Sequence, residues 1–271
     1  MSRGKGFSLI ELAVALAIIA LLIAGALIPL STQMDVRNVA DTRRTMESIR
    51  EAIIGFAQAN GRLPCAADGT IAAGTTNAGK ELCPNAFGVV PWATLGVPEV
   101  DGWGRRFSYW VSPIFADAIG TTFNNSFPSA QSPQCNPPIN PLSPAPTQSS
   151  FALCSMGSFT VNTRSEGNHT TPTPLGLQLP AVIISHGKNG FGAYTPAGAT
   201  LAAPTGADEI ANANHASAAT TFVSRVSTPN PSPLSCDDNS AASAFCEFDD
   251  IVVMIASNTL IARMVAAGRL P

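Results

Sequence analysis

The most apolar part of the chain lies close to its N-terminus. Residues 12–34 form a run of 23 amino acids without a charge. As an α-helix, with a rise of about 1.5 Å per residue, such a run is roughly 34 Å long. The hydrocarbon core of a bilayer is about 30 Å thick. This run therefore predicts a helix that crosses a membrane.

Helical periodicity continues beyond the apolar run. Within residues 35–60, apolar side chains recur at spacings of three, four and seven, at Val39, Met46, Ile49, Ile53 and Phe56. Such spacing places them on one helix face. Asn60 and Gly61 are typical of a helix C-terminus, and Pro64 prevents the helix from resuming. We expect one helix over residues 7–60, with the apolar face of its second half packed on a sheet.

After Pro64 the pattern changes to short apolar runs separated by loops. Strands are predicted at residues 106–112, 181–185 and 251–255, with weaker signals at 159–161 and 222–226. Residues 257–267 are expected to form a helix with Ser257 as its N-cap. Residues 112–150 and 195–233 are rich in Pro, Ser, Thr and Asn, which predicts long surface loops. The expected fold class is α+β, a long N-terminal helix packed on an antiparallel sheet in a loop-rich, disulfide-bonded head over residues 61–271.

The residues before the apolar run are few and basic. Arg3 and Lys5 precede it, and basic residues next to a membrane segment favour the cytoplasmic side. The N-terminus is therefore expected in the cytoplasm, and everything after Met34 outside it. In a secretory signal the small-residue cleavage site follows the apolar region, whereas Gly6-Phe7 precedes it here. An ordinary signal anchor is the alternative.

Glu11 is an acidic residue at the edge of a segment that is otherwise uncharged. A carboxylate inside a membrane is costly, and such groups usually have a partner. Cleavage between Gly6 and Phe7 would create one, the new α-amine of Phe7. The amine of an incoming subunit would then meet the carboxylate of its neighbour. Such a buried pair specifies register more than it adds net stability.

Residues 6–12, with the sequence GFSLIEL, followed by an uninterrupted apolar helix, resemble the prepilin signature of type IV pilins and type II secretion pseudopilins. The resemblance implies that residues 1–6 are a leader and that a prepilin peptidase cuts between Gly6 and Phe7. It also implies that Phe7 becomes N-methylated and that Glu11 recruits subunits. The partners it implies are other pilin or pseudopilin subunits, the prepilin peptidase, an inner-membrane assembly platform and the membrane itself.

Six cysteines follow the apolar run, at positions Cys65, Cys83, Cys135, Cys154, Cys236 and Cys246. None forms a CxxC pair, which disfavours zinc-ribbon and thioredoxin-type sites. An even number in an exported domain favours disulfides, and 15 pairings are possible. We expect sequential pairing, because each such pair closes a stretch rich in Gly, Pro or Asn. The alternative is a set of free thiols in a reducing compartment.

Three segments of the head add to the resemblance. Residues 101–104 (DGWG), 185–190 (SHGKNG) and 249–251 (DDI) are similar to segments of major pseudopilins, in which the corresponding turn and acidic pair surround calcium. The resemblance implies a calcium site at Asp249, Asp250 and Asn189, with carbonyl oxygens of residues 187–190 as further ligands. Asn189 stands where the family has Asp, and about 55 residues separate the turn from the acidic pair. The alternative is a solvated turn and acidic pair, with no cofactor required.

The formal net charge of −3 argues against nucleic acid as a partner of the head. We find none of the GxSxG, Walker, Rossmann or metal-binding histidine motifs, so no enzyme is predicted. The acidic pair at residues 208–209 is expected to be exposed and solvated, and the alternative is a second cation site. The predicted function is a structural subunit, minor or specialised, of a type IV pilus or type II secretion pseudopilus. It would be a single-pass inner-membrane protein with a periplasmic head, incorporated into a filament. The alternative is a displayed binding or adhesion module whose head loops contact a surface, cargo or DNA.

Overall fold

In a computed structural model of the chain, residues 8–117, 148–165, 168–215, 219–229 and 236–270 are described, with the backbone alone at residues 22–32 and 168–169. The chain forms two compact units, residues 1–40 and 41–271. Helix α1 (Leu9–Asn60) begins in the first unit and ends in the second. Its end at Asn60, followed by Gly61 at φ 71°, confirms the predicted helix C-terminus. Over the described residues, we find no helix whose length and hydropathy suffice to cross a membrane.

A four-stranded antiparallel sheet forms the centre of the head. Its strand order is β1-β2-β5-β7, with bounds Phe87–Val89, Ser108–Val111, Ala181–Ser185 and Ile251–Ile255. The strands predicted at 106–112, 181–185 and 251–255 are thus confirmed, and the three pair side by side. Short helices α2 (Trp92–Leu95) and α3 (Pro113–Ala116) flank β2 in sequence.

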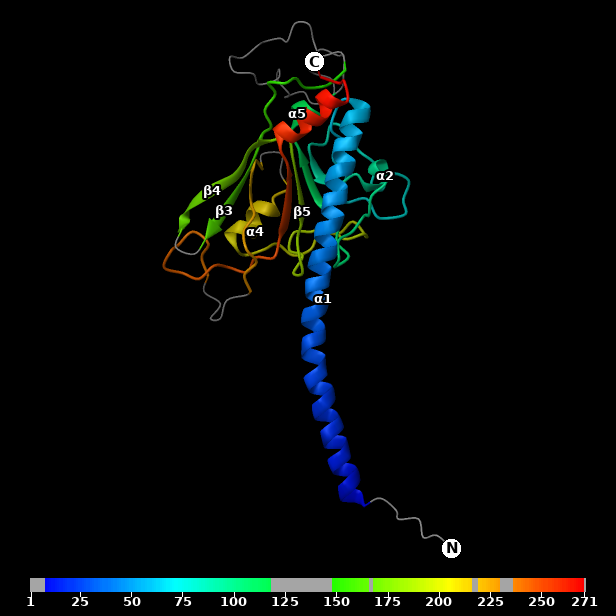
Figure 1. The fold of residues 1–271 in the computed structure, drawn as a ribbon, viewed down its shortest axis with the longest axis vertical. Coiled ribbons are helices and arrows are strands. Elements are labelled where there is room, and N and C mark those ends of the chain that lie inside the picture. The colour runs from blue at the N-terminus through cyan, green and yellow to red at the C-terminus, as the bar shows by residue number, and fades with distance from the viewer. Residues whose placement is uncertain (1–7, 118–147, 166–167, 216–218, 230–235, 271) are drawn as a thin grey trace. The chain divides into compact units, whose positions relative to one another are not determined.

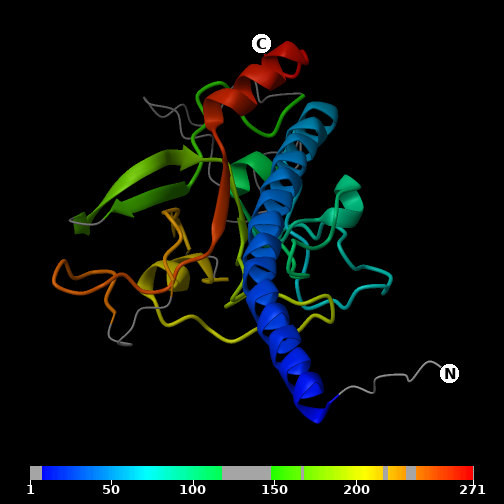
Figure 2. The same cartoon turned by 60° about the horizontal axis from the view of Figure 1, so that its bottom comes forward.

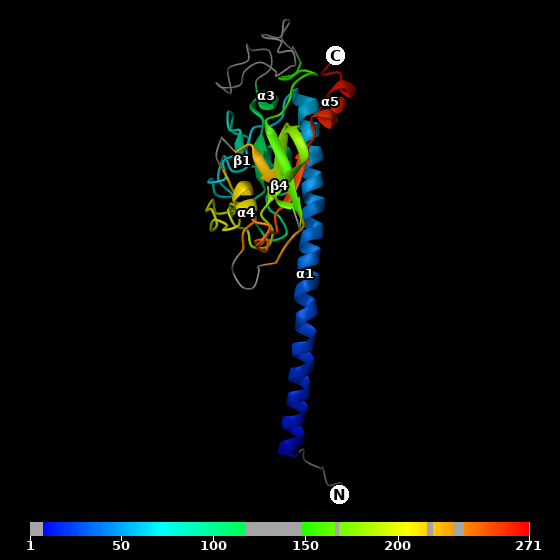
Figure 3. The ribbon, with the colours of Figure 1, turned by 90° about the vertical axis from the view of Figure 1, so that its left-hand side faces the viewer.

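Strand β5 is buried along its whole length, so each face of the sheet is covered. Ala181 and Ile183 belong to a core that includes the α1 residues Met46, Ile49 and Ile53. Helix α5 (Ser257–Ala266) contributes Leu260 and Met264 to the same core. Figures 1 and 3 show the head half of α1 lying along the sheet, with α5 near its end. Each fully buried Ile side chain contributes about 1.5–3 kcal/mol, so this apolar face anchors the helix.

The other face of the sheet packs against a second sheet of three strands. Its order is β4-β3-β6, with bounds Asn168–Leu179, Phe159–Ser165 and Thr221–Val223. Val182 and Ile184 of β5 share a core with Trp110, Phe159 and Phe222. In Figure 2 the β3–β4 hairpin and α1 lie on opposite sides of strand β7. The head therefore has three layers, helix, sheet and sheet.

The structure confirms the α+β class and corrects several details. The second sheet is mixed, because β3 pairs with β6 in parallel. The weaker strand signals at 159–161 and 222–226 fall on β3 and β6, whereas the expected loop at 195–233 also contains a half-buried helix, α4 (Ala207–Asn212), and the long strand β4 was not predicted. Ser257 does not cap α5, whose N-cap is Ala256. The Ser257 hydroxyl instead donates to the backbone oxygen of Gln178 at 2.7 Å.

Two of the three expected disulfides are confirmed, Cys65–Cys83 and Cys236–Cys246. Cys154 is also disulfide-bonded. Its expected partner, Cys135, lies outside the described residues, so that pairing stays a prediction.

Candidate functional site

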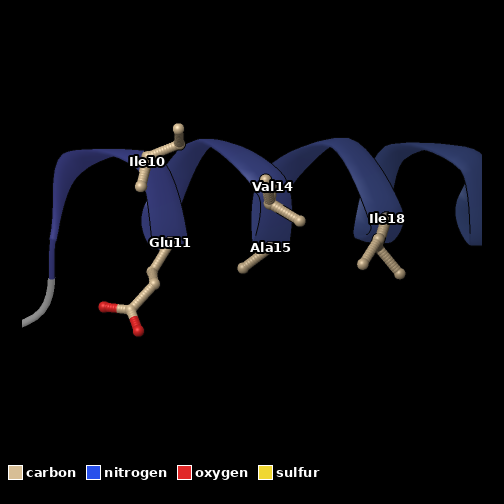
Figure 4. Close-up of a pocket in the computed structure, with 5 residues that line it drawn as sticks. All are labelled: Ile10, Glu11, Val14, Ala15 and Ile18. Atoms are coloured by element: carbon tan, nitrogen blue, oxygen red, sulfur yellow. The ribbon is translucent and has the colours of Figure 1, made fainter.

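The first turn of α1 holds Glu11 in a capping arrangement. The backbone N–H of Ser8 donates to Glu11 Oε2 at 2.9 Å, and the backbone N–H of Ile10 donates to the Ser8 hydroxyl at 3.3 Å. Side chains of this kind satisfy N–H groups that a helix start leaves free. Figure 4 shows the Glu11 carboxylate extending away from the helix on the side of Ala15. Glu11 thus has a partner within its own chain.

Apolar side chains surround Glu11 and remain exposed. Within residues 8–21, the exposed large apolar residues are Leu9, Ile10, Leu12, Val14, Leu16, Ile18, Ile19 and Leu21. Glu11 borders an open groove lined by Ile10, Val14, Ala15 and Ile18. A helix that is apolar on every side requires lipid or other apolar helices around it. Gly6 and Phe7 lie outside the described residues, so the cleavage site stays a prediction.

In the head, three carboxylates meet at one end of the central sheet. They belong to Glu209, Asp249 and Asp250, and one oxygen from each lies within 4.8 Å of the others. Asp249 and Asp250 directly precede β7, and Glu209 is carried by α4. The expectation that residues 208–209 are exposed is wrong, since Asp208 and Glu209 are 1% and 3% exposed. Glu209 is therefore a cluster residue that the sequence analysis missed.

The turn after β5 holds the cluster together. Asn189 donates from its backbone N–H to Asp249 Oδ2 at 2.8 Å and from its side-chain nitrogen to Glu209 Oε1 at 2.9 Å. Gly187 has φ 55°, and a Cβ there would lie 2.3 Å from the backbone oxygen of Asp249. Only glycine fits such a close approach at positive φ. The turn and the acidic pair are thus brought together across the chain, as the resemblance implied.

Burial makes the charged forms of this cluster costly. It raises the pKa of Glu209 to about 8, with the Asp250 and Asp249 charges adding to the shift. It also raises the pKa of Asp249 to about 6. The Oδ1 atom of Asp249 is buried and has no hydrogen-bond partner among the described residues. A proton or a bound cation would compensate such a cluster.

In this cluster the carboxylate oxygens, rather than the oxygens of the turn after β5, are the atoms that suit a divalent cation. The Arg105 guanidinium donates to the backbone oxygens of Gly187 and Lys188 at 2.6 and 2.7 Å. The Asn189 side-chain oxygen accepts the backbone N–H of Phe191 at 3.0 Å. These oxygens already have donors, whereas Asp249 Oδ1 has none among the described residues, and one oxygen each of Glu209, Asp249 and Asp250 converge, so these carboxylates are the groups that could hold a cation.

Asp250 also borders a buried chain of side chains that includes a serine and two histidines. Ser108 Oγ lies 2.8 Å from His186 Nε2 and 3.1 Å from His215 Nε2. His186 Nδ1 lies 3.7 Å from Asp250 Oδ1, which is too long for a hydrogen bond. Ser108 and His186 are fully buried in the head. Substrate cannot reach the serine hydroxyl in this arrangement, so the order Ser–His–Asp alone does not make a catalytic triad.

Raising the pH is expected to destabilise the head when divalent cations are absent. The pKa values of Glu209 (about 8) and Asp249 (about 6) are higher in the folded protein than their ordinary values. The folded state therefore binds protons that the unfolded state has released, and the melting temperature falls as the pH rises from about 5 to about 8. Glu209→Gln should flatten this dependence, because an amide stays neutral at every pH.

Thermal unfolding of the full-length protein in detergent with a chelator measures this effect. Glu47→Gln, on the exposed face of α1, is the matched control and should keep the wild-type pH dependence. An unchanged pH dependence in Glu209→Gln would show that Glu209 does not titrate in this range.

The comparison with family models gives one match. Residues 1–27 match the model of the prokaryotic N-terminal methylation motif. No curated protein and no solved structure was found to match the chain. The matched residues include Gly6, Phe7, Glu11 and the first part of the apolar run. The chain thus carries, at its N-terminus, the signature of type IV pilins and pseudopilins.

Proposed function

We propose that the chain is a structural subunit of a type IV pilus or type II secretion pseudopilus. The methylation motif at residues 1–27 carries this proposal. The exposed apolar surface of residues 8–21 supports it, because a filament core made of such helices would cover that surface. The large looped head, residues 61–271, favours a minor or specialised subunit.

Before assembly, the apolar N-terminal helix would anchor the chain in the inner membrane. Arg3 and Lys5 would keep the N-terminus cytoplasmic, and the head would fold in the periplasm. The two described disulfides fit that oxidising compartment. Prepilin peptidase would remove residues 1–6, and Phe7 would be N-methylated.

Assembly would then exchange the partner of Glu11. In the single chain the Glu11 carboxylate accepts the backbone N–H of Ser8. In a filament it would accept the charged amine of Phe7 from a neighbouring subunit. A charged donor makes a stronger hydrogen bond than a neutral amide, and an unpaired charge in apolar surroundings is costly. The exchange would therefore favour one register between neighbours.

Gly6→Leu is expected to leave residues 1–6 attached to the protein, because cleavage next to Phe7 requires a small side chain at position 6. Intact-mass analysis of protein extracted from membranes distinguishes the two forms. The wild-type protein should begin at a methylated Phe7. A wild-type protein that still carries residues 1–6, in cells with an active prepilin peptidase, would contradict the proposed processing.

Glu11→Ala is expected to abolish incorporation into filaments while the protein is still inserted, cleaved and folded. The Phe7 amine of a neighbour would lose its counter-ion, at a cost of about 3–5 kcal/mol. Insertion itself should become easier, because a charge leaves the bilayer. The amount of subunit in sheared filaments, relative to total membrane protein, measures incorporation separately from stability.

Glu11→Gln separates the charge from the helix cap. Glutamine can accept the Ser8 N–H as glutamate does, but it cannot neutralise an amine. Like Glu11→Ala, Glu11→Gln should therefore fail to assemble. Incorporation of Glu11→Asp should be intermediate, because its side chain is shorter. Normal incorporation of Glu11→Gln would refute recruitment by charge, and a membrane-displayed binding module would then explain the head better.

We further infer that the head binds calcium at Glu209, Asp249 and Asp250, with Asn189 holding two of these carboxylates in place. The convergence of the three oxygens and the buried Oδ1 of Asp249 support this inference. Calcium prefers carboxylate and other hard oxygen ligands, and extracellular modules bind it with dissociation constants of about 0.1–1 mM.

Calcium at about ten times its dissociation constant should stabilise the folded head by about 1.4 kcal/mol. The melting temperature should therefore rise at a pH of about 8, where the carboxylates are most charged. Glu209→Gln and Asp250→Asn should lose this response, and the control Glu47→Gln should keep it. If the melting temperature of the wild-type protein does not change in millimolar calcium, the cluster does not bind calcium and is stabilised by protons instead.

A further inference from the structure

Arg225, two residues after β6, is an enclosed cation. Its side chain is 1% exposed. Its guanidinium donates to Asp208 Oδ2 at 2.7 Å and to Asp238 Oδ1 at 3.2 Å. It also lies 4.5 Å from the centre of each of the rings of Phe245 and Phe248. Arginine in such a site is stable only while its partners stay in place.

The loop closed by the Cys236–Cys246 disulfide supplies three of the contacts of Arg225. Asp238 and Phe245 lie within the loop, and the backbone oxygen of Cys246 accepts from Arg225 Nη2 at 3.1 Å. The backbone N–H of Cys246 in turn donates to Asp238 Oδ1 at 2.9 Å. The disulfide thus holds together the two ends of the loop that face the guanidinium.

The same loop holds the start of α4. Asp238 Oδ2 accepts the backbone N–H of Asp208 at 3.2 Å, and Asp208 is the carboxylate that Arg225 contacts from α4. A Cβ at Gly206, the N-cap of α4, would lie 2.8 Å from the Cβ of Cys246. The helix is therefore in direct contact with the disulfide, as well as linked to it through charges.

Helix α4 connects the Arg225 site to the carboxylate cluster and to strand β6. Asn212 donates to Asp250 Oδ2 and to the backbone oxygen of Val223, both at 2.8 Å, and accepts the N–H of Val223. Glu209, on the same helix, reaches the carboxylate cluster. Displacement of α4 would therefore open both the cluster and the edge of β6.

We propose that the Cys236–Cys246 disulfide is an oxidation-dependent lock, which closes the Arg225 site and thereby fixes α4 against the head. When the lock forms, the two thiols lose two protons and two electrons to a disulfide oxidant, whose own disulfide becomes two thiols. With the thiols reduced, nothing covalent keeps Asp238 beside Arg225. Loss of Asp238 removes one of the two carboxylates that Arg225 contacts and leaves it with Asp208, which Arg164 also contacts; removing one partner from a buried charge favours opening.

Hydrogen exchange of the full-length protein in detergent tests the lock at α4. Two amides report on the helix, those of Ile210 and Ala213, which donate to the backbone oxygens of Gly206 and Glu209. In the double variant Cys236→Ser/Cys246→Ser these amides should exchange about tenfold faster or more. In the control Cys65→Ser/Cys83→Ser, which removes the other described disulfide, they should stay within about twofold of wild type.

Asp238→Asn tests the charge separately, because it keeps the disulfide and the loop. It should also accelerate exchange at Ile210 and Ala213, by less than the cysteine variant does. Should the cysteine variant not accumulate, Asp238→Asn and brief reduction of the wild-type protein take its place. Unchanged α4 exchange after loss of Cys236–Cys246, or equal acceleration in the Cys65/Cys83 control, would overturn the proposal. Neither result depends on filament assembly, so the lock can fail while the proposed function stands.

Discussion

The organisation of the head follows from the burial of strand β5 on both faces. All five of its residues are buried, and a strand of this kind is stable only when each face of its sheet is covered. The head half of α1, with α5, covers one face, and the β3–β4–β6 sheet covers the other. Met46, Ile49 and Ile53 are therefore structural in the head, whereas the large apolar side chains described within residues 9–21 of the same helix are exposed.

Buried polar groups lie at the C-terminal end of β5. Ser185 donates to Asp101 Oδ2 at 2.7 Å, and Asp101 Oδ1 accepts the backbone N–H groups of Trp103 and Arg105. Arg105 then reaches over the next turn to the oxygens of Gly187 and Lys188. Residues 101–105, 185–189 and 249 thus lie together at one end of the sheet, linked by these hydrogen bonds and by the bond from the Asn189 backbone N–H to Asp249.

Strong local patterns were predicted well from the sequence, whereas features that depend on tertiary context were not. The run that became β2 is rich in aromatic residues and those that became β5 and β7 are rich in β-branched ones, and such runs identify buried strands. Strand β4 contains Pro172, Pro174 and Gly176, which disfavour a strand; it tolerates them because the order β4-β3-β6 leaves it at a sheet edge. Helix α4 has six residues, too few for a helical period to be visible. Glu209 meets Asp249 across 40 residues, a proximity that no local pattern reveals.

Two charged side chains, Arg225 and Glu11, differ in the partners that the described residues supply to them. Arg225 obtains carboxylates, carbonyl oxygens and two aromatic rings from its own head, so the head can complete that site alone. Within the described residues, Glu11 accepts one backbone N–H, and apolar side chains are exposed around it. A charged amine would compensate a carboxylate better than a neutral amide does, so the proposed assembly through Glu11 would strengthen a site where the described residues supply one backbone N–H. Under that proposal the contact between subunits would lie at Glu11, whereas the Arg225 site is completed within the head.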